Sequence, residues 1–461
     1  MLATILDPMS GFATSIQVIL ILACLVLGTR YGGMGLGLIS GIGLLILTFV
    51  FGLKPGDPPV SVMLTIIAVI GCAATLQQAK GLDVMMQFAE RILRKHPERI
   101  TILAPITTWT LTVLCGTGHV VYTMFPIIED IAVKTNIRPE RPMAVSSTAA
   151  QMGITASPVS VAMVSLASIL AENAGVTGAA FSIPQILAVA LPASLSGVLV
   201  AALWSLRRGK DLDKDEEFQE RLKDPAFKEA VYGDSHSLIG QKFESSAYRA
   251  TYIFLAAIVL VVILGAAEWL RPSFPDKNGD LKALSMNLVI QMIMLVAGAC
   301  IMLFCKADAG KVASTTVFKA GMTAVFSVFG VAWMADTFFQ AHLDKLVEGL
   351  SGVVQNHAWA YAVVLLIVSK LVNSQGAAIV AIVPLGLKLG VSPETVIGFI
   401  GAAYGYFILP TYPSDLACIG FDKTGTTRIG KFVINHSFII PGFICVITSC
   451  AVGTLLAQIL L

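Results

Sequence analysis

The sequence has too few charged residues for a soluble protein of its length. Only 13% of its 461 residues are charged, whereas 56% are hydrophobic, and its mean hydropathy is +0.80. A soluble domain carries roughly 25% charged residues, so this chain cannot hide its apolar surface from water by folding alone. We therefore expect the lipid bilayer to be its solvent, with spans of ~20 apolar residues as the structural unit.

Features typical of enzymes and metalloproteins are also missing. The eight cysteines stand singly in apolar stretches, without a CxxC pair or a Cys/His cluster, so neither a disulfide framework nor a metal site is expected. The sequence lacks a paired nucleophile and base, and it lacks a GxxxxGK[ST] loop, which argues against an enzyme and against ATP as the energy source. The net charge of +2 gives no reason to expect a nucleic-acid partner, and no cofactor is expected.

Long apolar segments are present, and they occur in two similar sets. No basic residue precedes Arg30, so the first segment is expected to be a retained span rather than a cleaved signal peptide. Each half contains three spans, a short amphipathic stretch, an interrupted pair, a broken span and a last span. The expected parts are a first membrane repeat over 1–206, a charged cytoplasmic linker over 207–248, solvated and partly helical, and a second membrane repeat over 249–461. The expected hairpins are 101–133 and 358–388, and the expected broken helices are 143–170, open at 155–158, and 394–418, open at 409–413.

The interrupted segments of the two halves can be laid over each other. CGTGHVVYTMFP (115–126) falls on NSQGAAIVAIVP (373–384), and MGITASPVS (152–160) falls on FILPTYPSD (407–415). The second overlay places Pro158 on Pro413. This agreement indicates an internal repeat.

The distribution of basic residues predicts that the repeats are inverted. The amphipathic stretch 81–99 and the loop 134–142 are rich in Lys and Arg, whereas their counterparts 342–357 and 390–394 are poor in them. Because basic loops stay in the cytoplasm, corresponding segments lie on opposite sides of the membrane. We therefore predict an all-α polytopic protein with two inverted-topology repeats, each with about five spans and one re-entrant hairpin. The linker is cytoplasmic and both termini are periplasmic, although the basic loop 270–284 fits this arrangement poorly.

The four interruptions predict a small-anion site near the middle of the bilayer. Broken backbone survives in a membrane only inside protein or beside water, and half-helix N-termini carry the partial positive charge that binds carboxylates. Hydroxyl, amide and glycine residues at the breaks are the expected substrate contacts. They are Gly116, Thr117, Gly118, His119, Thr155, Ser157, Asn373, Ser374, Gln375, Thr411 and Ser414.

Two charged residues lie deep in the second apolar set. Lys370 and Asp415 are costly inside a bilayer and such residues usually serve function, so we expect charge pairing or coupling from them. The sequence leaves open whether Asp415 pairs with Lys370, takes a proton or binds a cation. Tyr404 and Tyr406 are expected to be packing residues.

Several motifs resemble a known transporter family. They are GTGHVVYT, RPERPMAVSS, QMGITASPVSVA, RGKDLDKDEEFQ, LVNSQ, LPTYPSDLA and IGKFVINHSF. From about residue 15 to the C-terminus the chain resembles the anaerobic C4-dicarboxylate transporters of the Dcu family, nearest to its DcuB-type branch. The resemblance implies a fold of the ion-transporter superfamily and exchange of fumarate, malate or aspartate for succinate across the bacterial inner membrane. Proton- or sodium-coupled symport, a homo-oligomer and contact with a membrane sensor kinase stay open.

Overall fold

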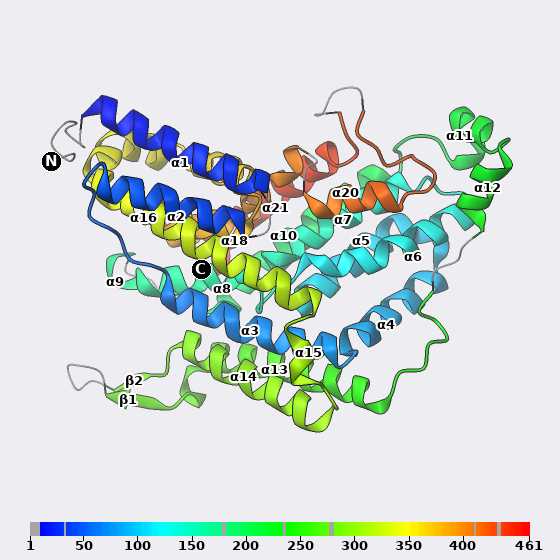
Figure 1. The fold of residues 1–461 in the computed structure, drawn as a ribbon, viewed down its shortest axis with the longest axis horizontal. Coiled ribbons are helices and arrows are strands. Elements are labelled where there is room, and N and C mark those ends of the chain that lie inside the picture. The colour runs from blue at the N-terminus through cyan, green and yellow to red at the C-terminus, as the bar shows by residue number, and fades with distance from the viewer. Residues whose placement is uncertain are drawn as a thin grey trace.

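The structure is nearly all helical. A computed structural model describes residues 10–31, 34–177, 181–233, 237–275, 281–409, 412–430 and 435–461. Figure 1 shows helices throughout this part of the chain, where the named strands are β1 (Ser273–Pro275) and β2 (Leu281–Ala283), an antiparallel pair. The predicted helical class is confirmed, and the short strand pair in the loop 270–284 is an addition that the sequence patterns did not predict.

The helices before the linker form the first set. They are α1 (Gly11–Tyr31), α2 (Gly35–Phe49), α3 (Val60–Gln78), α4 (Gly81–Lys95), η2 (Pro97–Arg99), α5 (Ile100–Cys115), η3 (Gly118–Val120), α6 (Val121–Lys134), α7 (Glu140–Ile154), α8 (Val161–Glu172), α9 (Ala174–Thr177) and α10 (Ile183–Ser205). Local sequence explains where some of them begin. Ser182 and Gln185 form a capping box at the start of α10, which pairs amides of the first turn that have no partner within the helix.

The linker and the second half supply the remaining helices. The linker contains η4 (Leu212–Lys214), α11 (Glu216–Arg221) and α12 (Pro225–Tyr232). The second set is α13 (Ser245–Ala266), η5 (Glu268–Leu270), α14 (Met286–Phe304), α15 (Ala309–Val312), α16 (Thr316–Asn356), α17 (Ala358–Val372), α18 (Gln375–Lys388), α19 (Pro393–Gly398), η6 (Ile400–Ala403), η7 (Tyr406–Ile408), α20 (Pro413–Phe421) and α21 (Ile439–Leu460).

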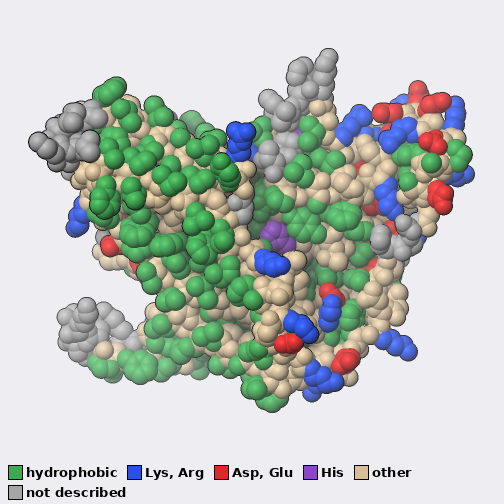
Figure 2. Space-filling model, in the orientation of Figure 1, with side chains coloured by type: hydrophobic (Ala, Val, Ile, Leu, Met, Phe, Trp, Pro, Cys, Tyr) green, Lys and Arg blue, Asp and Glu red, His purple; other side chains and the backbone are tan. Residues whose placement is uncertain are grey.

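Helix length and surface composition agree with a multi-pass membrane protein. Within the described residues, seven helices are long and apolar enough to cross a membrane: α1, α3, α10, α13, α14, α16 and α21. Figure 2 shows hydrophobic side chains over the region of α1 and α2, whereas charged side chains gather at the end formed by α11 and α12. An apolar flank and a charged end are what a bilayer and the adjoining water require.

Packing relates the two sets of helices by an approximate twofold axis. Helix α3 of the first set packs on α14 of the second, and the corresponding helix α16 of the second set packs on α2 of the first. Within the sets, α7 packs on α10 and the corresponding α19 packs on α21. Helices α10 and α21, which correspond to each other, lie side by side. In Figure 1 the corresponding helices α3 and α16 run in opposite directions, as do α1 and α13. This arrangement is that of an inverted repeat.

Both interrupted pairs form hairpins of two short helices. Helices α5 and α6 have 16 and 14 residues, and α17 and α18 have 15 and 14. At 1.5 Å per residue each arm is only ~21–24 Å long, which is shorter than the ~30 Å hydrocarbon core.

The two broken spans open over stretches of different length. The first is open from Thr155 to Ser160, close to the predicted position. The second is already irregular after α19, well before the predicted opening at 409–413, and continues as η6 and η7 to the start of α20. One cause is Gly405, whose amide donates to Ser369 Oγ of α17 (2.8 Å) instead of to a helical carbonyl.

The second amphipathic stretch is not a separate helix. In the first half, Lys80 with a φ of 63° separates α3 from α4. In the second half, α16 continues from Thr316 through the predicted stretch 342–357 as far as Asn356. The residues between the span and the stretch, DTFFQA (336–341), contain neither glycine nor proline, so the backbone has no local reason to stop being helical.

The linker is anchored on the helices by a few of its side chains, although most of its residues are exposed. The side chains of Leu212, Phe218 and Val231 are buried together with Val133 of α6. At the other end of the linker, Glu90 of α4 accepts hydrogen bonds from Ser237 Oγ and the Leu238 amide, both 2.7 Å. The linker is therefore mostly exposed and partly helical, while its few apolar residues form a small core with Val133 of α6.

An ion cluster ties the linker to both halves of the chain. Glu140, at the start of α7, accepts from Arg138 Nε (2.8 Å), from Arg208 (2.8 Å) and from Ser437 Oγ (2.6 Å). Arg138 also pairs with Asp215 of the linker. We call these five residues the Glu140 cluster. It joins the first half, the linker and the segment that precedes α21.

Candidate functional site

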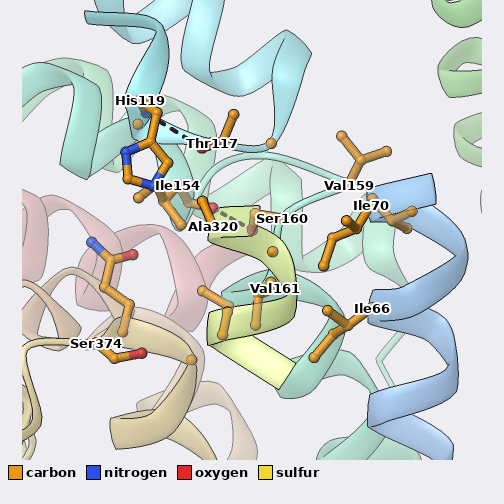
Figure 3. Close-up of a pocket in the computed structure, with 18 of the residues that line it drawn as sticks. Ile66, Ile70, Thr117, His119, Ile154, Val159, Ser160, Val161, Ala320 and Ser374 are labelled. Atoms are coloured by element: carbon orange, nitrogen blue, oxygen red, sulfur yellow. Dashed lines mark hydrogen bonds between the residues drawn. The ribbon is translucent and has the colours of Figure 1, made fainter. Parts of the chain in front are cut away.

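All four interruptions of the membrane helices meet at one cavity of about 140 Å³. The tips of both hairpins and the open stretches of both broken spans line it, and α3 and α16 close it with apolar side chains. Figure 3 shows Thr117 and His119 on one side, Ser374 on another, Ser160 between them, and Ile66 and Ile70 of α3 opposite. The prediction that the four breaks come together is confirmed.

The first hairpin tip requires glycine. Gly116 ends α5 with a φ of 72°, and a Cβ there would lie 2.6 Å from the carbonyl oxygen of Val159. Thr117 follows as the N-cap of η3, with its Oγ1 accepting from the His119 amide (3.3 Å). The His119 ring stacks on Tyr122 at 5.5 Å. Gly116, Thr117, Gly118 and His119 all line the cavity, and their contact with substrate stays a prediction.

The second hairpin tip repeats this arrangement with different residues. Asn373 ends α17 with a φ of 48°, and Ser374 caps α18 by accepting from the Ala377 amide (3.3 Å). Lys370 Nζ donates to Asn373 Oδ1 (3.1 Å). Asn373, Ser374 and Gln375 line the cavity, and their role as substrate contacts stays a prediction.

Three predicted contacts lie behind the cavity wall. The hydroxyls of Thr155 and Ser157 are fully buried and donate to the carbonyl oxygens of Met152 (3.0 Å) and Val113 (2.7 Å). Ser414 Oγ accepts from Ser147 (3.2 Å) and is also buried. These side chains brace the open backbone and are not among the lining residues. Thr411 lies outside the described residues.

The sequence reading missed three polar residues that do line the cavity: Ser160, Tyr406 and Tyr412. Ser160 caps α8 by accepting from the Met163 amide (3.1 Å), and a serine before an apolar run is a recognisable cap signal. Tyr406 is a buried packing residue, 1% exposed, as expected, and it also lines the cavity while its hydroxyl donates to Gln151 (2.7 Å). No sequence signal distinguishes it from a buried aromatic residue.

Four short helices direct their N-termini at the cavity. Thr117, Ser160, Ser374 and Tyr412 are the N-cap residues of η3 with α6, α8, α18 and α20, and all four line it. Each N-terminus carries a partial positive charge and amides without helical partners. In the described part of the chain no Asp, Glu, Lys or Arg lines the cavity. The site is therefore electropositive through backbone dipoles, two from each half of the chain.

The two membrane charges lie close to the site without lining it. Lys370 Nζ also reaches the carbonyl oxygens of Leu409 (3.3 Å) and Tyr406 (3.5 Å). Asp415 is 1% exposed, and its Oδ1 accepts from Ser147 Oγ (2.7 Å). Among the described residues Asp415 Oδ2 has no hydrogen-bond partner. In the same part of the chain no group of three or more His, Cys, Asp or Glu is placed to hold a metal ion.

Comparisons with known proteins agree on the class of molecule. Residues 13–461 match the family described as anaerobic C4-dicarboxylate membrane transporters. The chain is 54% identical to the anaerobic C4-dicarboxylate transporter DcuB of Escherichia coli, over 96% of this chain and 98% of that protein. It is 37% identical to the C4-dicarboxylate transporter DcuA of Wolinella succinogenes, over 96% and 99%.

A solved structure supports the fold. The chain is similar to the YdaH transporter of Alcanivorax borkumensis, reported to have an unusual topology, with a TM-score of 0.51, 16% identity and 97% of each chain covered. At this identity the likeness concerns the arrangement of helices and not the substrate.

Proposed function

Because this chain belongs to the family of anaerobic C4-dicarboxylate membrane transporters, we propose that it exchanges four-carbon dicarboxylates across the bacterial inner membrane. Fumarate, malate or aspartate enters while succinate leaves. The relatives DcuB and DcuA are named C4-dicarboxylate transporters, and the family consists of transporters and not enzymes, as expected from the sequence. The resemblance to the Dcu family is thereby confirmed.

One observation carries the proposal: four helix N-termini, two from each half, face one cavity of about 140 Å³. A dry cavity of roughly 150 Å³ holds benzene, so the volume suits a dianion with a four-carbon chain. Backbone amides at helix N-termini bind carboxylates without arginine or lysine. Two N-termini from each repeat suit one carboxylate at each end of the substrate.

The inverted repeat supports exchange by alternating access. Discontinuous helices around a closed central site are typical of transporters in which one part rocks against the other. We assign the moving parts to the repeats 1–206 and 249–461, with the charged linker 207–248 in the cytoplasm. Both termini are then assigned to the periplasm, as the distribution of basic residues predicts.

Exchange in proteoliposomes tests this function. Vesicles that contain purified protein are loaded with succinate and offered labelled fumarate outside. We expect uptake that rises with internal succinate and is small in vesicles without it. Equal uptake from loaded and empty vesicles would contradict exchange.

Asp415 favours a second candidate function, proton- or sodium-coupled symport. A fully buried carboxyl group with one unpartnered oxygen among the described residues is the kind of intramembrane acid that proton relays use. Under this alternative, Asp415→Asn abolishes fumarate uptake driven by an imposed pH or sodium gradient into empty vesicles, while the exchange with internal succinate remains. Gradient-driven uptake that survives in Asp415→Asn would exclude this residue as the coupling acid.

A further inference from the structure

Gln151 is hidden behind the cavity yet touches three of its four breaks. It lies on α7, 1% exposed, and its Oε1 accepts from the Tyr406 hydroxyl (2.7 Å). Its backbone oxygen accepts from Gln375 Nε2 (2.8 Å), and its own Nε2 donates to Ser414 Oγ (3.4 Å). A Cβ at Gly118 would lie 2.6 Å from Gln151 Nε2, so the first hairpin tip packs directly on this amide.

The partner of Gln151 is its own counterpart in the other repeat. The overlay of MGITASPVS on FILPTYPSD, extended by one residue toward the N-terminus, places Gln151 on Tyr406. The hydrogen bond between Gln151 and Tyr406 therefore joins the two repeats directly, next to the cavity.

This contact fixes two lining side chains at once. The Tyr406 hydroxyl donates to Gln151 and accepts from Gln375 Nε2 (3.3 Å). Gln375 Nε2 thus has two acceptors, the backbone carbonyl oxygen of Gln151 and the Tyr406 hydroxyl. Gln375 Nε2 is therefore held by Gln151 directly through the backbone and indirectly through the Tyr406 hydroxyl, while Gln375 Oε1 has no hydrogen-bond partner among the described residues.

We propose that Gln151 is a positioning residue for substrate. It does not touch the dicarboxylate, but it holds Tyr406 and Gln375 against the cavity at the point where the repeats meet. This inference rests on the proposed dicarboxylate exchange. Loss of the side-chain contacts of Gln151 weakens substrate binding, whereas helix α7 and the rest of the fold remain.

The test compares Gln151→Met, which keeps the length of the side chain but removes its hydrogen bonds, with Thr108→Val. Thr108 is equally buried and donates to the Pro105 (3.0 Å) and Ser146 (3.2 Å) carbonyls away from the cavity. We expect Gln151→Met to raise the KM for labelled fumarate in succinate-loaded vesicles about 10-fold, with the maximal rate within 2-fold, because a lost neutral hydrogen bond typically costs about 1 kcal/mol and more is lost in a network. Thr108→Val should leave the KM unchanged.

A double-mutant cycle distinguishes a positioning role of Gln151 from a general loss of packing around the cavity. Since Gln151 acts through Tyr406, the double variant Gln151→Met/Tyr406→Phe should raise the KM no more than the more damaging single change, whereas independent effects would multiply. Multiplied effects, or an unchanged KM in Gln151→Met, would overturn the inference. If Gln151→Met does not fold, Gln151→Asn, which keeps an amide one methylene too short to reach Tyr406, replaces it in the same cycle. Wild-type protein without any exchange would instead sink the proposed function.

Discussion

At the scale of single residues, the two hairpin tips meet the same backbone requirement in different ways. Gly116 and Asn373 both adopt a positive φ, 72° and 48°, a region that costs most residues about 1–2 kcal/mol. Glycine avoids the cost by having no Cβ, and asparagine tolerates it while keeping a side chain. Asn373 can therefore accept a hydrogen bond from Lys370, which glycine cannot do. The second tip combines a turn residue with a polar contact beside the site.

Two substitutions of Asn373 separate its backbone from its side-chain role. Both Asn373→Gly and Asn373→Ala remove the contact to Lys370 Nζ, so each should weaken fumarate binding about 10- to 100-fold, the effect of one hydrogen bond to a charged group of about 1.5–3 kcal/mol. Only alanine is strained at a φ of 48°, by about 1–2 kcal/mol, so only Asn373→Ala should lower the thermal unfolding midpoint. Binding is measured by calorimetry in detergent. Wild-type affinity in Asn373→Gly would remove this side chain from the site.

At the scale of elements, the breaks support one another through close backbone packing. The tip between α5 and α6 lies against the open stretch before α8, with no room for a Cβ at Gly116 beside the Val159 carbonyl (2.6 Å). Ser157 Oγ of that stretch donates to the Val113 carbonyl of α5 (2.7 Å). The hairpin and the broken helix of the first half therefore position each other, and neither can shift alone.

Gly116→Ala tests this mutual support. We expect it to lower the free energy of unfolding by at least about 2 kcal/mol, because it adds steric overlap to left-handed backbone strain, and to lower the exchange rate more than 10-fold. The matched control is Gly41→Ala in α2, where a Cβ meets nothing within 4 Å and alanine favours the helix. Thermal unfolding and vesicle exchange are the measurements. Equal behaviour of both variants would show that the tip is loosely packed.

At the scale of the whole molecule, the distribution of charge and the direction of the helices agree. Charged side chains gather at the end with α11 and α12 (Figure 2), and α9, β1 and β2 lie at the opposite end (Figure 1). Corresponding helices of the two sets run in opposite directions. This geometry places corresponding loops of the two repeats on opposite faces of the membrane.

Cysteine labelling tests the faces. A cysteine at exposed Gly175 of α9 should react with an impermeant maleimide from the periplasmic side only. A cysteine at Glu216, whose side chain is 92% exposed in the linker, should react only from the cytoplasmic side. Right-side-out and inverted vesicles give the two measurements, with unmodified protein as the background for native cysteines. Labelling of position 175 from the cytoplasm alone would contradict the inverted arrangement.

Sequence patterns predicted the elements of the site better than the orientation of its side chains. Glycine, proline and polar residues inside apolar segments have a strong physical meaning, because a membrane does not tolerate open backbone elsewhere. The hairpins and breaks followed from that. Whether a buried hydroxyl faces the cavity depends on helix rotation and on the nearest free carbonyl, which no single sequence encodes. Thr155 and Ser157 therefore lie behind the wall, whereas Ser160 lines it.

Long-range contacts explain the other differences. The burial of the linker residues Leu212 and Phe218 with Val133 of α6 could not be foreseen from their charged neighbours in the sequence. The hydrogen bond between Tyr406 and Gln151 joins two segments that are distant in the sequence. Both depend on tertiary packing, which overrides local composition.

The Glu140 cluster holds three segments together on one side of the molecule. It fastens the start of α7, the linker and the segment before α21 at one point, and separating them would strand a buried carboxylate at a cost of several kcal/mol. Opening a path from the cavity to the cytoplasm between these three segments would therefore cost that free energy. The linker, through Arg208 and Asp215, thus helps to hold this side of the molecule closed.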